Sequence, residues 1–425
     1  MQDETTEVKV ALLASLHGDV DHETLLNLIV AHNGSVSQAS LALQSRQAGA
    51  TKDKASEDKA SEDNASGRRQ QSLKRYATAS DNGHGAKKPN VRWKKGSTLH
   101  LYDADDVSQH TPCSIIHNFL PAHEADELLR ELLDEAKTFQ KSTFKLFDQV
   151  VSSRHTSSFY VESYEALQGQ KADYYYNGSK LTDVRPITRQ LSNVKPVVQM
   201  AVNSEMERRI RTRYPGGQKL KHQSGDEWVP NMAFVNCYQG GDESVGWHSD
   251  QLTYLGPRAV IGSLSLGVAR EFRVRRVCPA SGEAAGQIAI HLPHNSLLVM
   301  HAEMQEEWKH CVAPAASIDP HPVAGNRRIN ITYRHYRDYM HPRHTPRCSC
   351  AVPCVLRVVQ KRPGNQGRYF WMCHAGNVPG KQACCFFQWA EFDCHGKPLL
   401  PSEPSACNKK AEAAMEPTRV EPRDG

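Results

Sequence analysis

The stretch RRINITYRHY, residues 327–336, has the alternation of a β-strand. Arg328, Asn330, Thr332 and Arg334 stand at every second position, so they are predicted to share one face of that strand. Two arginines on the inner face of a barrel would be costly unless an anion neutralised them. A small dicarboxylate would satisfy both through bidentate contacts, whereas a solvated sheet edge is the alternative interpretation.

Short apolar segments of the same kind lead up to this strand. After Pro230 they are MAFVNCY (232–238), AVIGSLSL (259–266), EFRVRRV (271–277), QIAIHL (287–292) and SLLVMH (296–301), separated by turns rich in Gly and Pro. So many closely spaced strands predict a sandwich or a double-stranded β-helix (jelly roll). A strand at 113–120, an amphipathic helix at 122–139 and a second helix at roughly 184–213 complete an α+β domain with its helices packed outside.

Composition sets limits on the rest. The chain has 425 residues, of which 39% are hydrophobic and 23% charged, enough for two or three folded units with a sizeable core. Its net charge is only +5, so a nucleic-acid partner would have to be met by local basic patches. The acidic start MQDETTEVKV does not resemble a secretory signal, and the absence of long apolar runs predicts no membrane span.

The stretch VGWHSDQ, residues 245–251, offers a candidate metal site. His248 and Asp250 follow the strand 232–238 and the turn QGGDES, and His310 follows the strand 296–301. Two histidines and one carboxylate on different jelly-roll strands can bind one face of an octahedral ion, which leaves three positions open and suits non-haem Fe(II). The alternative is a pair of polar residues on a surface strand.

These elements together resemble the AlkB family of Fe(II)/2-oxoglutarate dioxygenases. The resemblance covers roughly residues 113–340 and rests on NCY (236–238), HSD (248–250), His310 and RINITYR (328–334) in this order. It implies that His248, Asp250 and His310 bind iron, and that His301, a rival by residue type, does not. It further implies that Arg328, helped by Tyr238 and Asn330, holds the distal carboxylate of 2-oxoglutarate, and that Arg334 and Asn236 complete the pocket.

The same resemblance implies O2-dependent oxidative demethylation of N-alkylated bases in nucleic acid, with formaldehyde as a product. DNA-acting members carry an acidic residue shortly after the HxD aspartate, where this chain has Gln251, Leu252 and Thr253. Hydroxylation of 5-methylcytosine or of a protein side chain therefore stays open, as does a nucleic-acid- or ubiquitin-binding adaptor with an inactive core. SSRHTSSFY (152–160) resembles the nucleotide-recognition lid, with Arg154 and Phe159 as contacts, or is a plain core strand.

Eight of the twelve cysteines crowd into residues 348–407, which in a reducing compartment indicates a metal site rather than disulfides. The stretch 347–392 resembles a GRF-type zinc finger, on the residues Gly367-Arg368-x-Phe370, Trp371, Cys373 and the ending CCFFQW (384–389). The resemblance implies structural Zn2+ on Cys348, Cys350, Cys373 and Cys384, and single-stranded DNA or RNA as partner. The expected nucleic-acid contacts are Arg357, Lys361, Arg368, Phe370 and Trp371, with Phe386 and Trp389 partly structural.

Three helices predicted in residues 5–45 resemble a CUE ubiquitin-binding domain, with departures at Leu16, His17, Gly18 and Gln44. Residues 46–100 form a linker predicted to be disordered, whose basic half includes Arg68, Arg69, Lys87 and Lys88 and predicts nuclear localisation. We therefore expect a CUE-like bundle at 5–45, the dioxygenase at 110–342, the finger at 345–394 and a disordered tail at 395–425. The protein is expected to be a nuclear monomer, with ubiquitin or a ubiquitylated protein as a further partner.

Overall fold

The structure is a computed structural model of the 425-residue chain. It describes residues 98–146, 149–162, 168, 175–176, 179–180, 183–279, 286–362, 364–378 and 380–399, with positions 13, 25, 28, 32, 36, 38–40, 42 and 43. The chain divides into two compact units, Met1–Arg92 and Trp93–Gly425. In the first, Leu13, Leu25, Leu28, Ala39 and Leu43 form a small buried cluster. Most of the expected CUE-like bundle and its basic linker lie outside the described residues.

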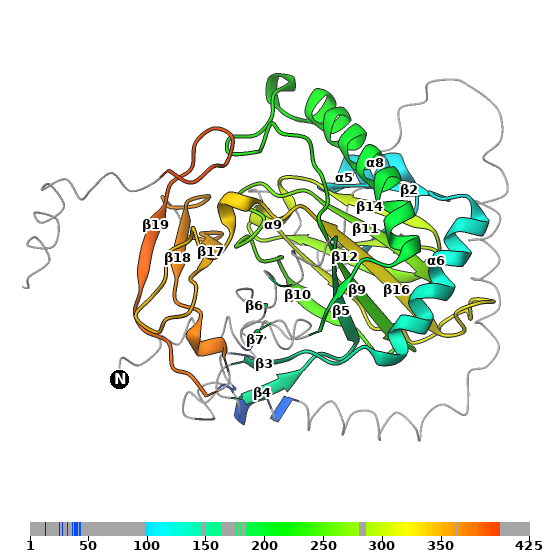
Figure 1. The fold of residues 1–425 in the computed structure, drawn as a ribbon, viewed down its shortest axis with the longest axis horizontal. Coiled ribbons are helices and arrows are strands. Elements are labelled where there is room, and N and C mark those ends of the chain that lie inside the picture. The colour runs from blue at the N-terminus through cyan, green and yellow to red at the C-terminus, as the bar shows by residue number, and fades with distance from the viewer. Residues whose placement is uncertain are drawn as a thin grey trace, which may run out of the picture. The chain divides into compact units, whose positions relative to one another are not determined.

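The second unit contains a jelly roll of two sheets (Figure 1). The larger sheet has seven strands in the order β2 (Cys113–His117), β14 (Ser296–Met300), β11 (Ile261–Gly267), β16 (Arg327–Arg334), β9 (Met232–Gln239), β5 (Thr156–Val161) and β8 (Val184–Pro186). The smaller has five, in the order β1 (Thr98–Leu101), β13 (Gln287–Leu292), β12 (Arg270–Arg276), β15 (Trp308–Val312) and β10 (Val245–His248). The predicted jelly-roll fold is confirmed.

Strand β16 separates two hydrophobic clusters because its side chains alternate. Ile329, Ile331 and Tyr333 belong to a cluster shared with the helices that cover the larger sheet. The polar row that begins at Arg328 lies on the other face, with Phe234 and Tyr238 of the paired strand β9. The row predicted from the sequence is thus buried inside the barrel.

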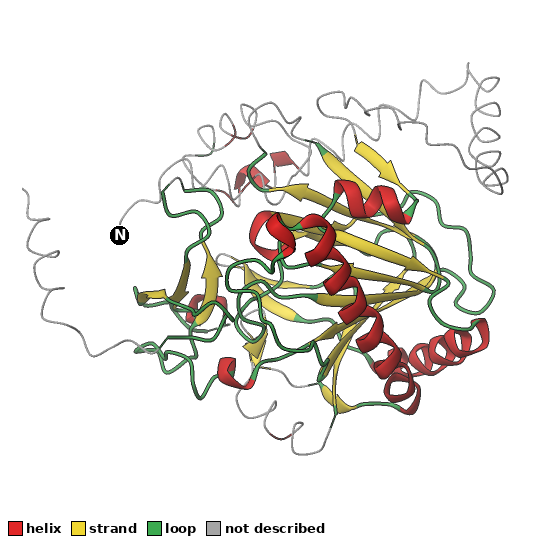
Figure 2. Cartoon of the chain, turned by 90° about the horizontal axis from the view of Figure 1, so that it is seen from above, coloured by secondary structure: helices red, strands yellow, loops and turns green. Residues whose placement is uncertain are grey.

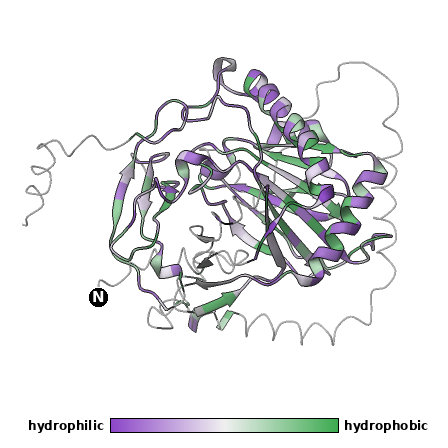
Figure 3. Cartoon of the chain, viewed as in Figure 1, coloured by the Kyte–Doolittle hydropathy of each residue, from purple (hydrophilic) through white to green (hydrophobic). Residues whose placement is uncertain are grey.

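Two long helices, α6 (Ala122–Glu135) and α8 (Arg189–Arg213), run alongside the seven-stranded sheet in Figures 1 and 2. In α6, Leu128, Leu129, Leu132 and Leu133 are buried at the spacing of one helical face. In α8, Leu191, Val194, Val198 and Val202 do the same, and Figure 3 shows hydrophilic residues along much of the rest of the helix. Gly262 allows close approach, since a Cβ there would lie 3.0 Å from Val202.

The second helix was predicted to start near residue 184, which is wrong by five residues. Residues 184–186 instead form β8, which pairs in parallel with β5. Helix α8 begins after Thr188, whose side chain accepts a hydrogen bond from the Leu191 amide as an N-cap. In the sequence, the three extended residues of β8 were not distinguishable from a helical apolar pattern.

Shorter elements fill the connections of this unit. They are α5 (Ala104–His110), α9 (Met304–Glu307), β3 (Thr143–Leu146), β4 (Gln149–Ser152), β6 (Tyr175–Tyr176), β7 (Ser179–Lys180) and the 3-10 turns Ala136–Thr138, Pro215–Gly217, Asp338–Met340 and Ala375–Asn377. Strand β1 corrects the expected linker boundary, because residues 98–101 pair with Gln287–Ile290 of β13. Among the described residues, no helix is long and apolar enough to cross a membrane.

A three-stranded sheet of β17 (Val355–Val358), β18 (Tyr369–Met372) and β19 (Phe387–Ala390) forms the finger. Its buried residues Leu356, Tyr369 and Trp371 belong to the same hydrophobic cluster as Leu252 and Tyr254 of the barrel. Residues 395–399, expected in a disordered tail, fold back onto the finger, since Leu399 donates its amide to the Glu391 carbonyl. The finger is therefore packed against the barrel rather than separated from it.

Candidate active site and metal centres

The pairing of β10 with β15 brings His248 opposite His310, and Asp250 follows two residues after His248. The Asp250 Oδ1 atom lies 3.5 Å from His248 Nε2 and 3.4 Å from His310 Nε2. One ligand atom from each side chain lies within 4.8 Å of the other two. The side chains of Asp250 and His310 are 6% exposed and that of His248 is 38% exposed, so the group opens to solvent on the His248 side.

The protonation of these groups suits a metal ion. The His248 Nδ1 atom lies 2.8 Å from the Gly246 carbonyl and donates to it, which leaves the Nε2 lone pair directed at the group. Burial, followed by the nearby His248, lowers the pKa of His310 to about 4. Burial raises the pKa of Asp250, but Arg334 and the two histidines outweigh it and hold that pKa well below its usual range. Neutral imidazoles and an ionised carboxylate are the forms that bind a divalent cation.

Arg328 is a buried cation without a carboxylate partner among the described residues. It is 1% exposed, and its Nη2 donates to Ser265 Oγ over 2.9 Å. Within the described chain, its Nε and Nη1 have no hydrogen-bond partner. Burial lowers the pKa of Arg328 to about 10, and the nearby charge of Arg270 lowers it further. Tyr238, whose ring centroid lies 5.3 Å from the guanidinium carbon, raises this pKa. Such a guanidinium fits a dicarboxylate that supplies the missing charge and acceptors.

Arg334, on the same strand face as Arg328, contacts the metal group directly. Its Nη2 and Nε donate to Asp250 Oδ2 over 2.7 and 3.2 Å, while Asp250 Oδ1 faces the two histidines. The carboxylate thus has one oxygen fixed by a guanidinium and one presented to the site. The family resemblance had placed Arg334 in the cosubstrate pocket alone, and its contact with Asp250 was not foreseen.

The two asparagines predicted for the cosubstrate pocket, Asn236 and Asn330, make different hydrogen bonds. Asn236 Oδ1 accepts a hydrogen bond from His155 Nε2 over 3.0 Å. The amide nitrogen of Asn330 donates to Ser263 Oγ and to the Leu264 carbonyl, and its oxygen accepts from Thr332. Asn330 is therefore engaged inside the sheet, where it holds the polar row in place. The rival histidine, His301, bonds Ser114 Oγ at 2.8 Å and lies outside the metal group.

Sequence reasoning missed His155 as part of this site. Its ring stacks on Tyr238 with centroids 4.8 Å apart, and burial is the main cause that lowers its pKa to about 4. No motif singles it out, because it reaches the site through the antiparallel pairing of β5 with β9. The same pairing corrects the lid interpretation of residues 152–160: Phe159 is 4% exposed and stacks on Phe234 in the core.

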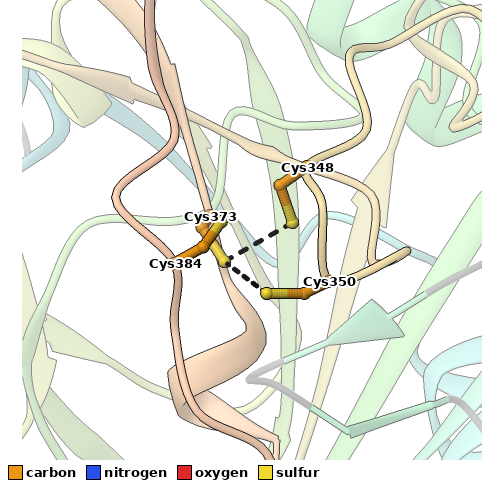
Figure 4. A group of neighbouring side chains, drawn as sticks. All are labelled: Cys348, Cys350, Cys373 and Cys384. Carbon is orange, nitrogen blue, oxygen red and sulfur yellow. Dashed lines mark hydrogen bonds between the residues drawn. The ribbon is translucent and has the colours of Figure 1, made fainter.

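Four cysteines of the finger converge as Figure 4 shows: Cys348, Cys350, Cys373 and Cys384. The Cys373 sulfur lies 3.5 Å from that of Cys348 and 3.9 Å from that of Cys350. Thiolates bound to a tetrahedral zinc at ~2.3 Å lie about 3.8 Å apart, so the group fits this ion. Hydrogen bonds from Ser349 and from the Phe386 amide lower the pKa of Cys384 to about 6, which favours the thiolate. Cys354, Cys385 and Cys394 lie outside the group.

The finger also carries an aromatic face, on which Phe387 is exposed and Phe370 and Trp389 are half-buried. Phe370 stacks on Phe387 at 5.2 Å, both rings contact Trp389, and the Arg368 guanidinium lies 3.9 Å above the Trp389 ring. Trp371, predicted to contact nucleic acid, is only 5% exposed and packs in the core. This prediction was wrong, because alternate residues of β18 face opposite sides and the one beside Phe370 points inward.

Hydrogen bonds connect the finger to the loops that carry the metal group. The Gln360 side-chain nitrogen donates to Ser249 Oγ over 3.3 Å and to the Gln305 carbonyl over 3.2 Å. The Gln305 side chain in turn accepts the Asp250 amide at 2.7 Å. The Tyr369 hydroxyl donates to buried Glu306, next to Gln305. These hydrogen bonds from the finger hold the HSD segment (248–250) in position.

Leu252 and Thr253, which differ from the acidic residue expected after Asp250, also lie in the contact between the finger and the barrel. Leu252 and Thr253 are 3% and 2% exposed, and Thr253 Oγ1 accepts the amide hydrogen of Leu356 in β17. Residues that stand where DNA-acting relatives are expected to carry an acid are used here to seat the finger.

Comparison with known proteins agrees with this geometry. The 2OG-Fe(II) oxygenase superfamily matches residues 112–334, and the GRF zinc finger matches residues 346–393. The chain is similar to the "Alpha-ketoglutarate-dependent dioxygenase alkB homolog 3" of Rattus norvegicus, at 34% identity over 27% of this chain and 38% of that protein. It is also similar to the "DNA oxidative demethylase ALKBH2" of Arabidopsis thaliana, at 30% identity over 24% of this chain and 37% of that protein.

A shorter similarity, 42% identity over 12% of this chain and 9% of the other, links it to the "Endonuclease 8-like 3" of Xenopus laevis. The chain spans about two fifths of the length of the first curated relatives it matches. The superfamily match covers more than half of the chain, and that family uses Fe(II), 2-oxoglutarate and O2, while the cysteine group takes structural zinc. The chain therefore belongs to the 2OG-Fe(II) oxygenase superfamily, and it carries a GRF zinc finger.

Proposed function

We propose that this dioxygenase is an oxidative demethylase of N-alkylated bases in single-stranded nucleic acid. The observation that carries the proposal is the solvent opening of the metal group on the His248 side, in a barrel against which a finger with an exposed Phe387 and a half-buried Phe370 is packed. Unpaired bases stack on such rings with about 1–3 kcal/mol each, largely independent of sequence. The names of the AlkB-like relatives, one of them a DNA oxidative demethylase, support the reaction.

We assign roles to the side chains of the site accordingly. His248, Asp250 and His310 hold the iron, and Arg328 with Tyr238 holds the distal carboxylate of 2-oxoglutarate. Arg334 fixes the unused oxygen of Asp250, so the ligand oxygen keeps its orientation. Asn330 and Asn236 keep the inner row and His155 in register.

When bound, iron and 2-oxoglutarate supply the O2-dependent oxidation of a C–H bond, with succinate and carbon dioxide as co-products. The chain's contribution is to exclude water and to hold the methyl group at the His248 opening. An N-methyl group hydroxylated there leaves as formaldehyde, which restores the base without further help from the protein.

A second substrate class stays a candidate because of Leu252 and Thr253. Their burial under the finger leaves no carboxylate at the positions where DNA-acting relatives are expected to select the lesion. Hydroxylation of 5-methylcytosine or of a protein side chain would leave a stable hydroxylated product instead of formaldehyde.

The remaining parts extend the proposal. The residues proposed to contact the nucleic acid are Arg357, Lys361, Arg368 and Phe370, joined by Phe387 and Trp389. The basic segment before residue 98 is proposed to direct a monomeric protein to the nucleus, and the bundle at 5–45 to bind ubiquitin or a ubiquitylated protein.

The deciding experiment offers defined substrates to the full chain. The protein is incubated with Fe(II), 2-oxoglutarate and ascorbate, and with single-stranded oligonucleotides that carry 1-methyladenine, 3-methylcytosine or 5-methylcytosine, as DNA and as RNA. Mass spectrometry is expected to show restored adenine or cytosine with equimolar formaldehyde. Succinate formed without any change in these oligonucleotides would reject the demethylase, and 5-hydroxymethylcytosine as the sole product would favour the second class.

A further inference from the structure

A second group of two histidines and one carboxylate lies on the smaller sheet. His100 of β1, Glu271 of β12 and His291 of β13 come from three neighbouring strands, and we call them the outer group. One ligand atom from each side chain lies within 4.8 Å of the other two, as in the group at His248. His100 is exposed and the other two are half-buried. The two histidines stand 191 positions apart in the chain, so the sequence does not show the group.

Strand alternation places the outer group on the sheet face that is turned away from the barrel interior. In β12, Phe272 belongs to the interior cluster and stacks on His310 at 5.2 Å, so its neighbour Glu271 points outwards. In β13, Ile290 belongs to the same interior cluster, so its neighbour His291 points outwards as well. The sheet therefore separates the outer group from the metal group inside the barrel.

The carboxylate of Glu271 is arranged like that of Asp250. Arg273 donates through Nε and Nη2 to Glu271 Oε2 over 2.8 and 2.7 Å. The other oxygen, Oε1, lies 3.7 Å from His100 Nδ1. Inside the barrel, Arg334 likewise bonds Asp250 Oδ2 and leaves Oδ1 facing the two histidines. In both groups a guanidinium fixes one carboxylate oxygen, and the other oxygen is presented to the imidazoles in one orientation.

The imidazoles of the outer group present nitrogens that a cation can use. His100 Nδ1 and His291 Nε2 lie 2.9 Å apart, so one of them carries a proton that the other accepts. Among the described hydrogen bonds, neither nitrogen accepts from a backbone amide. The Tyr102 ring stacks on that of His291 with centroids 4.1 Å apart, which holds the imidazole in its orientation. A divalent ion that replaces the shared proton would bind both nitrogens, because neutral imidazole is the form that binds metals.

A third group of similar composition, Asp126, His294 and His321, lacks this property. His294 Nδ1 accepts the Gly267 amide, and His321 Nδ1 accepts the amides two and three residues further along the chain. A neutral ring whose Nδ1 accepts a hydrogen bond carries its proton on Nε2. The Nε2 of His294, 3.9 Å from Asp126 Oδ1, is therefore a donor to that carboxylate and not a metal ligand. This group provides a matched control for the outer group.

We propose that His100, Glu271 and His291 bind a zinc ion, with water in the fourth position. Imidazole nitrogens and a carboxylate oxygen are ligands that zinc takes in tetrahedral geometry, and sites of this kind bind zinc more tightly than Fe(II). Strand β1 lies at the edge of the smaller sheet and pairs with β13 over four residues. The ion would link β1 to β12 across β13, so it would hold this edge strand against the barrel.

The test measures zinc binding to the full chain by isothermal titration calorimetry. The chain carries zinc in the finger and the substitution His248→Ala, so the cysteine group is filled and the group inside the barrel lacks a ligand. One further zinc ion per chain is expected. His100→Asn, Glu271→Ala and His291→Asn should each lower its affinity at least about a hundredfold, since replacing even the residues behind metal ligands costs about 10–100-fold. His321→Asn, the control, should change neither the number of ions nor their affinity.

Hydrogen exchange gives a second readout that is independent of turnover. With zinc at about 100 times Kd, protection of the β1 amides should rise about a hundredfold if their opening breaks the site, and His291→Asn should remove this gain. Before zinc is added, the variants are expected to melt at the temperature of their parent, which shows that they fold. Absence of a further zinc ion at millimolar concentration would overturn the proposal. Equal losses of affinity in His291→Asn and His321→Asn would overturn it as well, because zinc would then be spread over surface histidines.

Discussion

Arg328 shows how a single residue can be costly alone and useful with its ligand. Its guanidinium is 1% exposed, and among the described residues it has no carboxylate to balance it. Removing an uncompensated buried charge tends to stabilise a fold, whereas removing one member of a satisfied pair destabilises it. The same substitution should therefore have opposite effects with and without the dicarboxylate.

We predict that Arg328→Met keeps or raises the melting temperature of the protein in the absence of 2-oxoglutarate. In the unsubstituted protein, millimolar 2-oxoglutarate should raise the melting temperature, and in Arg328→Met this shift should vanish. Loss of a charge-assisted pair of hydrogen bonds, about 3 kcal/mol or more in total, should also raise KM for 2-oxoglutarate by at least about a hundredfold. Thermal shift assays decide, and an undiminished ligand shift in the variant would contradict the assignment.

His248→Ala is predicted to abolish succinate formation while zinc content and binding of unmodified single strands persist. The reason is that His248 lies in the metal group but makes no contact with the cysteine group. Succinate and zinc are measured on the same preparation. His301→Ala is the matched control, because that histidine bonds Ser114 away from the group, and it should retain turnover if it folds. Residual turnover in His248→Ala would remove this histidine from the set of ligands.

Much of the site was predictable residue by residue, because most of its polar side chains lie in short sequence motifs. The alternation in β16 predicts one inner face, and the structure buries that row. What the sequence could not provide is the partner of each residue across strands. The bond between Arg334 and Asp250, the place of His155 and the burial of Trp371 all depend on pairings between distant segments.

At the scale of elements, α9 and the HSD loop are held by the finger. Gln360 donates to both Ser249 and Gln305, and Gln305 holds the Asp250 amide. Residues behind metal ligands commonly change metal affinity by about 10–100-fold when they are replaced. The finger thus helps to hold Ser249 and Asp250 of the metal group's loop in place, in addition to any role in binding nucleic acid.

We predict that Gln360→Ala weakens binding of Mn(II), a spectroscopic substitute for Fe(II), by about tenfold, with zinc content unchanged. Electron paramagnetic resonance measures free Mn(II) directly, so turnover is not needed. Gln366→Ala is the control, since Gln366 is exposed on the same finger and makes no hydrogen bond to the metal loops among the described contacts. Equal Mn(II) affinity in the two variants would show that the loop holds its shape without Gln360.

Element boundaries followed from the sequence where the signal was local, and failed where it was not. The leucine pattern of α6 predicted that helix to within its terminal 3-10 turn. Strand β1 was missed because its partner, β13, lies about 190 residues further along the chain. A four-residue strand next to a polar segment is too short to be predicted from alternation of apolar and polar residues.

At the scale of the whole molecule, the finger and the barrel are packed together within the second unit. The finger and the barrel interior share one hydrophobic cluster, which includes Leu252 and Tyr254 on one side and Leu356 and Trp371 on the other. Apolar surface buried between two parts couples their stabilities, because unfolding one exposes the surface of the other to water.

Removal of zinc should therefore lower the stability of the barrel as well as that of the finger. We predict that chelation of zinc, or Cys373→Ser, lowers the melting temperature of the whole second unit in one cooperative transition, and that amides of β10 and β15 exchange faster with deuterium. Those two strands carry His248 and His310, which we propose as iron ligands, and they border the loops bonded to the finger, whereas β2, at the far edge of the larger sheet, should be protected as before. Two separate transitions, with β10 and β15 exchanging at their original rates, would mean that the shared cluster does not couple the finger to the barrel. The expected pattern would instead make zinc a condition for the iron site and not only for the nucleic-acid surface.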